Sequence, residues 1–213
     1  MVGNSISTYR LEDQTCGKSW NEWVQLWWRW CYYEPFENSP ALDNSGQYCS
    51  RGQMYNELWF LAGTFGGKAE RTCEIPPNRS LFLPIVNDLI SFATDPHLKT
   101  ESDLLAYAKA DIDSNRYLSV KLDSVKVPES AYYRIRSTVF TLRVPSGKEE
   151  SCPVETRAVS DGYWIFLRPL SQGYHLLEIK SEKLEFDKMI TESVNNTTVP
   201  LFQVEVTYHL TIK

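Results

Sequence analysis

Two carboxylates, an amide and an imidazole lie close together in the sequence, at Asn87, Asp88, Asp95 and His97. Asn87 and Asp88 end a predicted strand, and Asp95 and His97 occupy the loop that follows, where folds often display functional groups. Carboxylate and amide oxygens suit a hard divalent cation, which can activate water for hydrolysis. Asp88 and His97 are therefore candidate catalytic residues, and Asp88, Asp95 and His97 are candidate metal ligands. The alternative is that these residues only form turns and caps, as polar residues beside a proline usually do.

The chain has only three histidines, which limits acid–base and metal chemistry. His175 alternates in phase with the apolar residues Leu177 and Ile179, so we expect it on the core side of a strand. His209 has the phase of the polar residues in the last strand. Because successive side chains point to opposite faces, the two imidazoles should not share a metal ion if their strands lie in one sheet.

Familiar catalytic motifs are absent or incomplete. The run 15–19 (TCGKS) ends like a phosphate loop but lacks its first glycine, and no apolar strand precedes it. The glycines of 63–67 (GTFGG) miss dinucleotide-binding spacing and are better explained as a hairpin turn that needs positive φ. No GxSxG nucleophile elbow is present.

The five cysteines are Cys16, Cys31, Cys49, Cys73 and Cys152. None has the CxxC spacing typical of structural zinc. Cys49 and Cys73 each lie beside a turn-rich segment, which favours a disulfide between them, with Cys16 to Cys31 or Cys152 as a second bridge. Buried free thiols are the alternative.

Composition indicates a folded domain without a nucleic-acid partner. The chain has 213 residues, 42% of them hydrophobic and 13% aromatic, which suffices for one domain spanning 1–213. A net charge of −5 and the lack of a basic stripe argue against a nucleic-acid partner, whose phosphates need clustered Lys and Arg. No apolar run is long enough to span a membrane, and the first residues lack the features of a signal peptide. No cofactor is expected, although a divalent cation would suit the acidic cluster.

Two helices are predicted to position these groups. Ser19 and Glu22 form a capping box that opens a helix over about 19–33, and tryptophans at helical spacing give it an apolar face. That face predicts burial in a core, with a ligand-stacking surface as the alternative. Thr100 and Asp103 cap a second helix over about 100–113.

The remaining elements are predicted strands. In 57–92, three short apolar runs separated by turns suggest a meander. In 117–213 the hydrophobic period is two, with a change of phase near Val139 and a turn at Asp161-Gly162. The sequence therefore predicts a mainly β (α+β) fold, a two-sheet antiparallel β-sandwich with a Trp-rich N-terminal helix and one further short helix.

Several of these segments, including WFLAGTFGG, RTCEIP, SLFLPIVN and VEVTYHLTI, resemble strings in an uncharacterised group of mostly bacterial, predicted-secreted proteins. The resemblance implies a secreted or periplasmic β-rich domain, but no activity or ligand. The run 169–179 (PLSQGYHLLEI) also resembles a hairpin of immunoglobulin-like and fibronectin-like sandwiches, which serve in many binding modules.

These observations favour a non-catalytic extracytoplasmic binding or interaction module that recognises a carbohydrate, a protein or a small molecule through its surplus aromatics. The first alternative is a metal-assisted hydrolase of a small ester or lactone, with Asp88, Asp95 and His97 as ligands or base. The second is a structural or assembly subunit that forms an oligomer.

Overall fold

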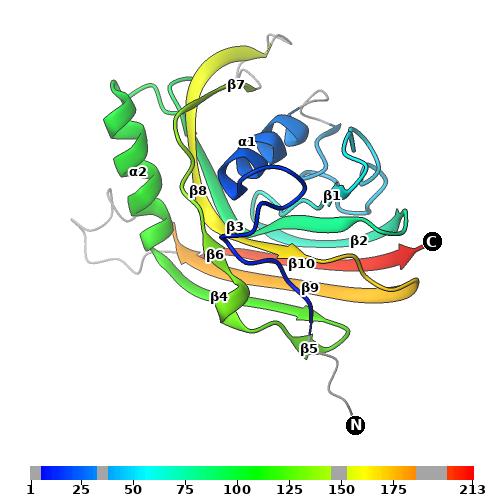
Figure 1. The fold of residues 1–213 in the computed structure, drawn as a ribbon. Coiled ribbons are helices and arrows are strands. Elements are labelled where there is room, and N and C mark those ends of the chain that lie inside the picture. The colour runs from blue at the N-terminus through cyan, green and yellow to red at the C-terminus, as the bar shows by residue number, and fades with distance from the viewer. Residues whose placement is uncertain (1–5, 33–37, 145–152, 186–200) are drawn as a thin grey trace.

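The fold is a sandwich of two five-stranded sheets with one helix against each side of the first sheet (Figure 1). The computed structural model describes residues 6–32, 38–144, 153–185 and 201–213. The α-helices are α1 (Trp20–Cys31) and α2 (Glu101–Asp113), and a short 3-10 helix, η2, spans Glu129–Ala131. The strands are β1 (Leu58–Phe60), β2 (Gly67–Ile75), β3 (Ser80–Ser91), β4 (Asn115–Leu122), β5 (Val125–Lys126), β6 (Tyr133–Arg134), β7 (Phe140–Val144), β8 (Val154–Leu167), β9 (Gly173–Leu184) and β10 (Leu201–Ile212).

Each sheet is mixed rather than wholly antiparallel. The first has the order β1-β3-β8-β6, with β7 also paired to β8, and the second has the order β2-β10-β9-β4-β5. The pairs β1–β3 and β2–β10 are parallel. A parallel pair needs a crossover, so the predicted meander over 57–92 is wrong: β2 leaves β1 and β3 and joins the other sheet. The glycine run is thus a link between sheets, with φ of +99° at Gly66 and +79° at Gly67, and not a hairpin turn.

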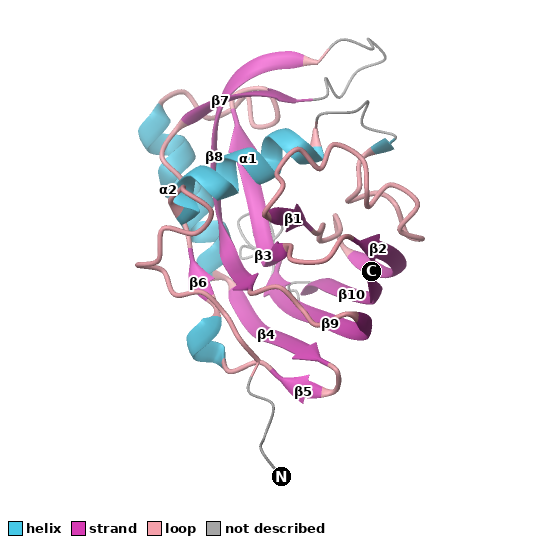
Figure 2. Ribbon diagram, turned by 45° about the vertical axis from the view of Figure 1, so that its right-hand side comes forward, coloured by secondary structure: helices cyan, strands magenta, loops and turns pink. Residues whose placement is uncertain are grey.

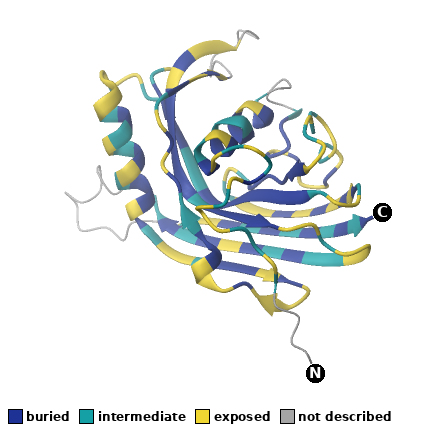
Figure 3. Cartoon of the chain, in the orientation of Figure 1, coloured by how far each residue is buried: buried dark blue, intermediate teal, exposed yellow. Residues whose placement is uncertain are grey.

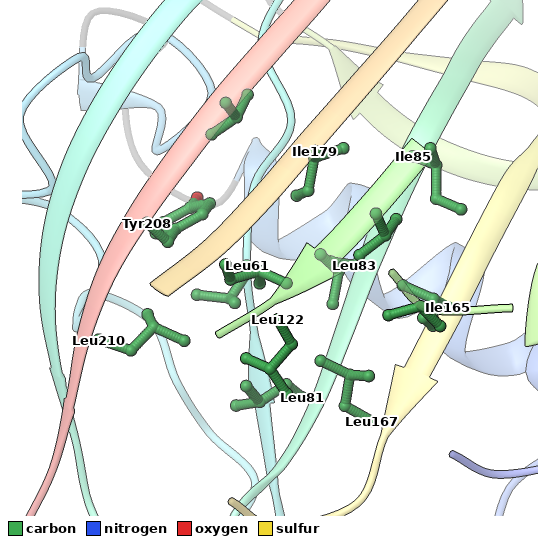
Figure 4. Close-up of a cluster of buried hydrophobic side chains, with 14 of the residues drawn as sticks. Leu61, Leu81, Leu83, Ile85, Leu122, Ile165, Leu167, Ile179, Tyr208 and Leu210 are labelled. Atoms are coloured by element: carbon green, nitrogen blue, oxygen red, sulfur yellow. The ribbon is translucent and has the colours of Figure 1, made fainter. Parts of the chain in front are cut away.

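The strands of the second half of the chain follow the predicted two-residue period. Along β10, Val204, Val206, Tyr208, Leu210 and Ile212 are all buried, while the residues between them are partly exposed (Figure 3). Side chains from both sheets meet in the core between the layers (Figure 4). The expected break near Val139 is also present, since β6 and β7 are separate strands that pair with different parts of β8.

Helix α1 forms a second core on the outer face of the first sheet (Figure 2). Its capping box is present: the Ser19 hydroxyl accepts from the Glu22 amide, and the Glu22 carboxylate accepts from the Ser19 amide at 2.8 Å. The five tryptophans of the helix are 1–3% exposed, and Trp20 packs edge-on to Phe82 of β3 and Phe166 of β8. The core interpretation of this aromatic face is confirmed. The predicted last residue of the helix, Tyr33, lies outside the described residues.

Helix α2 covers the opposite face of β3 and β8, beyond the end of the second sheet (Figure 1). Thr100 and Asp103 form its capping box, as predicted. Leu104 and Ala108 pack there against Ile90 and Val159. This helix and the ends of the second sheet therefore meet over the same part of the first sheet.

The turn predicted at Asp161-Gly162 is wrong, because both residues lie in the middle of β8. A Cβ atom on Gly162 would lie 2.6 Å from the Val86 carbonyl oxygen, so glycine is needed here for close approach of two strands. The Asp161 carboxylate is 1% exposed and forms an ion pair with Arg134 at 2.9 Å. This ion pair, and not a turn, accounts for an aspartate at position 161.

Candidate functional site

A cavity of about 440 Å³ opens where α1, α2, β3 and the ends of β9 and β10 meet. Its size lies within the usual range for small-molecule sites. Aromatic side chains from four separate segments line it: Trp27, Trp28, Phe65, Tyr107 and Phe202. Its polar lining includes four carboxylates and one ammonium group: Asp88, Asp95, Asp111, Glu185 and Lys183.

Lys183 lies at the centre of the polar wall. It is 5% exposed, and its ammonium group donates to the Asp111 carboxylate and, at 3.4 Å, to Asp88. It also lies 5.2 Å from the centre of the Phe202 ring, within reach of a cation–π interaction. Burial of an unpaired ammonium group would be costly, so these three contacts explain why the lysine can remain here.

Asp111 has an altered proton affinity. Its burial, followed by the negative charge of Asp88, raises the pKa of this carboxyl from 3.8 to about 7, although Lys183 acts in the opposite direction. Burial also raises the pKa of the Tyr32 phenol above its usual range, with smaller contributions from Cys31 and Asp88. A carboxyl that exchanges protons near neutral pH beside a second carboxylate is a feature of many functional sites.

The structure places the predicted site residues in different surroundings. Asp88 and Asp95 both line the cavity, whereas His97 is not among its lining residues and packs edge-on to the Tyr107 ring at 5.6 Å. The Asp95 carboxylate accepts from the Ser91 amide at 3.1 Å, and so it caps the turn after β3. Within the described ranges, no group of three or more His, Cys, Asp or Glu side chains is arranged to hold a metal ion.

Asn87 lies at the edge of the same cavity. Its Cβ is 2.6 Å from the position that a Cβ on Gly162 would take, which fixes the backbone tightly between β3 and β8. Its amide nitrogen is buried and has no hydrogen-bond partner among the described residues.

Comparison with known proteins adds no information on function. No protein-family model, no curated protein and no solved structure matches the chain. None of the described helices is long and apolar enough to cross a membrane.

Lys183 and Asp111 were missed at the sequence level, although the patterns that place them inward are visible. Lys183 has the same strand phase as Leu177 and Ile179, and Asp111 follows Ala108 on the apolar stripe of α2. A charged residue in a buried phase is a signal for a paired charge or a site. What the sequence does not show is that the end of β9 reaches α2.

The cysteines predicted to pair are free thiols in the structure. Cys49 and Cys73 are nevertheless neighbours: a hydrogen bond between the thiols lowers the pKa of Cys49 and, with burial, raises that of Cys73. The two thiols are therefore close together, but the predicted disulfide is not formed between them. Cys16 and Cys31 are also free, and Cys152 lies outside the described residues.

The two strand histidines point to opposite faces of one sheet, as predicted. His175 is paired in register with Leu210, and His209 with Leu176. The His209 imidazole contacts Glu70 at 2.7 Å on the outer face. Neither imidazole lines the cavity.

The surroundings of His175 show an arrangement that the sequence did not reveal. Its Nδ1 lies 2.7 Å from Asp123, and its Nε2 lies 3.3 Å from the Ser171 hydroxyl, which is the order of a serine–histidine–aspartate set. However, Nε2 also lies 2.9 Å from the Ser171 carbonyl oxygen, which can only accept a hydrogen bond. The ring nitrogen must then donate to it and is not free to take a proton from the hydroxyl. The contacts join the β8–β9 turn to the β4–β5 turn.

Proposed function

We propose that this protein is a non-catalytic binding module that holds a small organic molecule in the cavity between α1, α2 and the ends of β3 and β9. The observation that supports the proposal is the cavity itself, with aromatic side chains on several walls and a small group of polar side chains on another. This combination is typical of small-molecule sites, where the apolar walls supply affinity and the polar groups fix orientation.

The burial of the tryptophans changes the kind of ligand recognition that the sequence predicted. All seven are at most 5% exposed, so they do not offer an aromatic platform on the molecular surface. The indole N–H groups of Trp27 and Trp28 donate to the Leu61 carbonyl at 2.9 Å and to the Ser160 hydroxyl at 2.7 Å. These bonds hold the two rings at the cavity wall. An enclosed small molecule therefore fits the geometry better than an extended carbohydrate on a flat surface.

A library screen by thermal shift tests this function. Compounds that raise the melting temperature of the protein should fail to do so after Thr64→Trp, because the new ring fills the cavity that Thr64 lines. Thr207→Trp is the matched control, since this residue lies on the outer face of β10, away from the cavity. If ligands stabilise the Thr64→Trp protein as much as the control, the cavity is not the binding site.

A hydrolase that acts on a small ester or lactone is the second candidate. It is favoured by one observation: Asp88, Asp95 and the carboxyl of Asp111, with its pKa of about 7, line the same cavity. A carboxyl with that pKa suits general acid–base catalysis at neutral pH. Metal content by elemental analysis and turnover of p-nitrophenyl acetate and γ-butyrolactone distinguish the candidates. Turnover that Asp111→Asn abolishes and Glu178→Gln leaves intact would favour the enzyme.

We also propose an extracytoplasmic location, on the resemblance to predicted-secreted proteins alone. Fractionation of cells that express the gene from its own start site would test it. Recovery of the protein in the cytoplasm would contradict this location without affecting the proposal for the cavity.

A further inference from the structure

The charges around the cavity indicate which ligands it favours. Among the described lining residues, four carboxylates face one ammonium group. Even when Asp111 holds a proton, the two negative charges of Asp88 and Asp95 outnumber the single positive charge of Lys183. A recess with apolar walls focuses this field, because the walls have a low dielectric constant. The cavity therefore attracts cations and repels anions.

Lys183 does not reverse this preference. Its ammonium group already contacts Asp111 and Asp88, and it is 5% exposed. An anionic ligand would have to compete with these two carboxylates for the same donor. No second Lys or Arg is among the described residues that line the cavity.

Asp88 is the carboxylate best placed to meet a ligand. One of its oxygens accepts from the Leu89 amide at 2.7 Å, and the other is 3.4 Å from Lys183, at the long limit of a hydrogen bond. Its side chain is 39% exposed, whereas that of Asp111 is 5% exposed. A carboxylate has about four acceptor sites, so Asp88 retains acceptor capacity toward the cavity.

The walls also suit a positive charge. Lys183 shows this directly, because its ammonium group lies between two carboxylates and above the Phe202 ring. The rings of Trp28, Phe65 and Tyr107 line the rest of the cavity. Aromatic faces beside carboxylates are a common environment for organic ammonium groups, since the ring quadrupole adds to the ionic attraction.

We propose that the ligand is an organic amine, protonated at neutral pH, whose ammonium group binds Asp88 while its carbon skeleton packs against the aromatic walls. This inference depends on the proposed binding function and specifies its ligand class. A hydrophobic amine suits both the apolar walls and the carboxylates, whereas a neutral alcohol would bring no positive charge beyond that of Lys183 and an acid would be repelled.

Three probes of similar size test the inference by isothermal titration calorimetry: 2-phenylethylamine, the neutral 2-phenylethanol and the anion phenylacetate. We expect the amine to bind at least about tenfold more tightly than the other two, because only the amine can form a hydrogen bond with Asp88 in which both the donor and the acceptor are charged. Asp88→Asn should weaken amine binding by a similar factor. Glu178→Gln removes the same charge from the outer face of β9 and should leave amine binding unchanged.

The possible results test the ligand class separately from the proposed binding function. Equal binding of the alcohol or the anion would overturn the amine proposal while leaving the cavity as a binding site. No binding of the amine would also overturn it, and the library screen with Thr64→Trp would then decide the function independently. Far-UV circular dichroism of Asp88→Asn checks folding, and the comparison of the three probes on the unmodified protein remains decisive if that variant is unstable.

Discussion

At the scale of single residues, Asp111 links the chemistry of the cavity to the stability of the fold. Its carboxyl is buried against Lys183, and its pKa is raised from 3.8 to about 7. A raised pKa means that the folded state binds this proton more tightly than the unfolded state does. The stabilisation is complete below about pH 4 and is lost as the pH rises through about 7.

Asp111→Asn should therefore change the pH dependence of folding. We expect the free energy of unfolding of the unmodified protein, relative to the variant, to fall between pH 4 and pH 7.5. The total change is on the order of 4 kcal/mol at most, as the size of the pKa shift implies. Urea denaturation at several pH values measures it, and carbon NMR of the carboxyl gives the pKa directly.

Asp103 provides a control, because its pKa is shifted in the opposite direction and its effect on stability should have the opposite pH dependence. Backbone amides of Lys99 and Thr100 lower the pKa of this exposed capping carboxylate, so its stabilisation is present above its unfolded pKa and is lost as the pH falls. Asp103→Asn should thus lose stability relative to the unmodified protein at neutral pH and approach it in acid. A pH-independent difference for Asp111→Asn would show that this carboxyl titrates normally.

At the scale of elements, two ionic clusters hold α2 against the sheets. Lys183 of β9 lies between Asp111 and Asp88, and Arg134 lies between Asp113 and Asp161 at 2.6 and 2.9 Å. Each cluster joins α2 to β3 or β8, and Asp88 and Asp161 are direct neighbours in those strands. One cluster faces the cavity, so the same helix contact that stabilises the fold also shapes the site.

The contact between β3 and β8 depends on a glycine, which a substitution can test. Gly162→Ala would place a Cβ 2.6 Å from both the Val86 oxygen and the Asn87 Cβ. We expect a loss of about 2–3 kcal/mol in the free energy of unfolding, because the backbone cannot move aside without disturbing the register. Gly63→Ala meets only the Pro84 ring at 3.5 Å and should change stability by less than about 0.5 kcal/mol. Similar values for the two variants in urea denaturation would contradict this role for Gly162.

The same elements show what local sequence patterns can predict. The caps at Ser19 and Thr100 and the alternation in β10 depend on neighbours in the chain, and each was predicted correctly. The path of β2 into the second sheet depends on contacts with β10, which lies more than a hundred residues away, and it was not predicted. The lining of the cavity shows the same limit: Asp88 was a candidate from the sequence, but Lys183, which contacts it, and Asp111, which contacts the same lysine, come from other elements.

At the scale of the whole molecule, the two large cores share the strands that separate them. Along β3, Leu81 and Leu83 face the second sheet, while Phe82 between them faces α1. Residues of β8 do the same, with Ile165 and Leu167 on one side and Trp164 and Phe166 on the other; all four are fully buried. Neither core can lose these strands without exposing the other, so the domain should unfold as one unit.

Substitutions in each core test this cooperativity. Leu83→Ala in the sandwich core and Phe60→Ala in the helix core should each lower the free energy of unfolding by about 3 kcal/mol, because both side chains are at most 1% exposed. Six of the seven tryptophans belong to the helix core, so fluorescence reports mainly on that core, whereas far-UV circular dichroism reports on both sheets. We expect the two signals to change together in urea for both variants. If Leu83→Ala shifted the circular dichroism transition while fluorescence stayed unchanged, α1 and its core would be a separate folding unit, and the shared strands would not couple them.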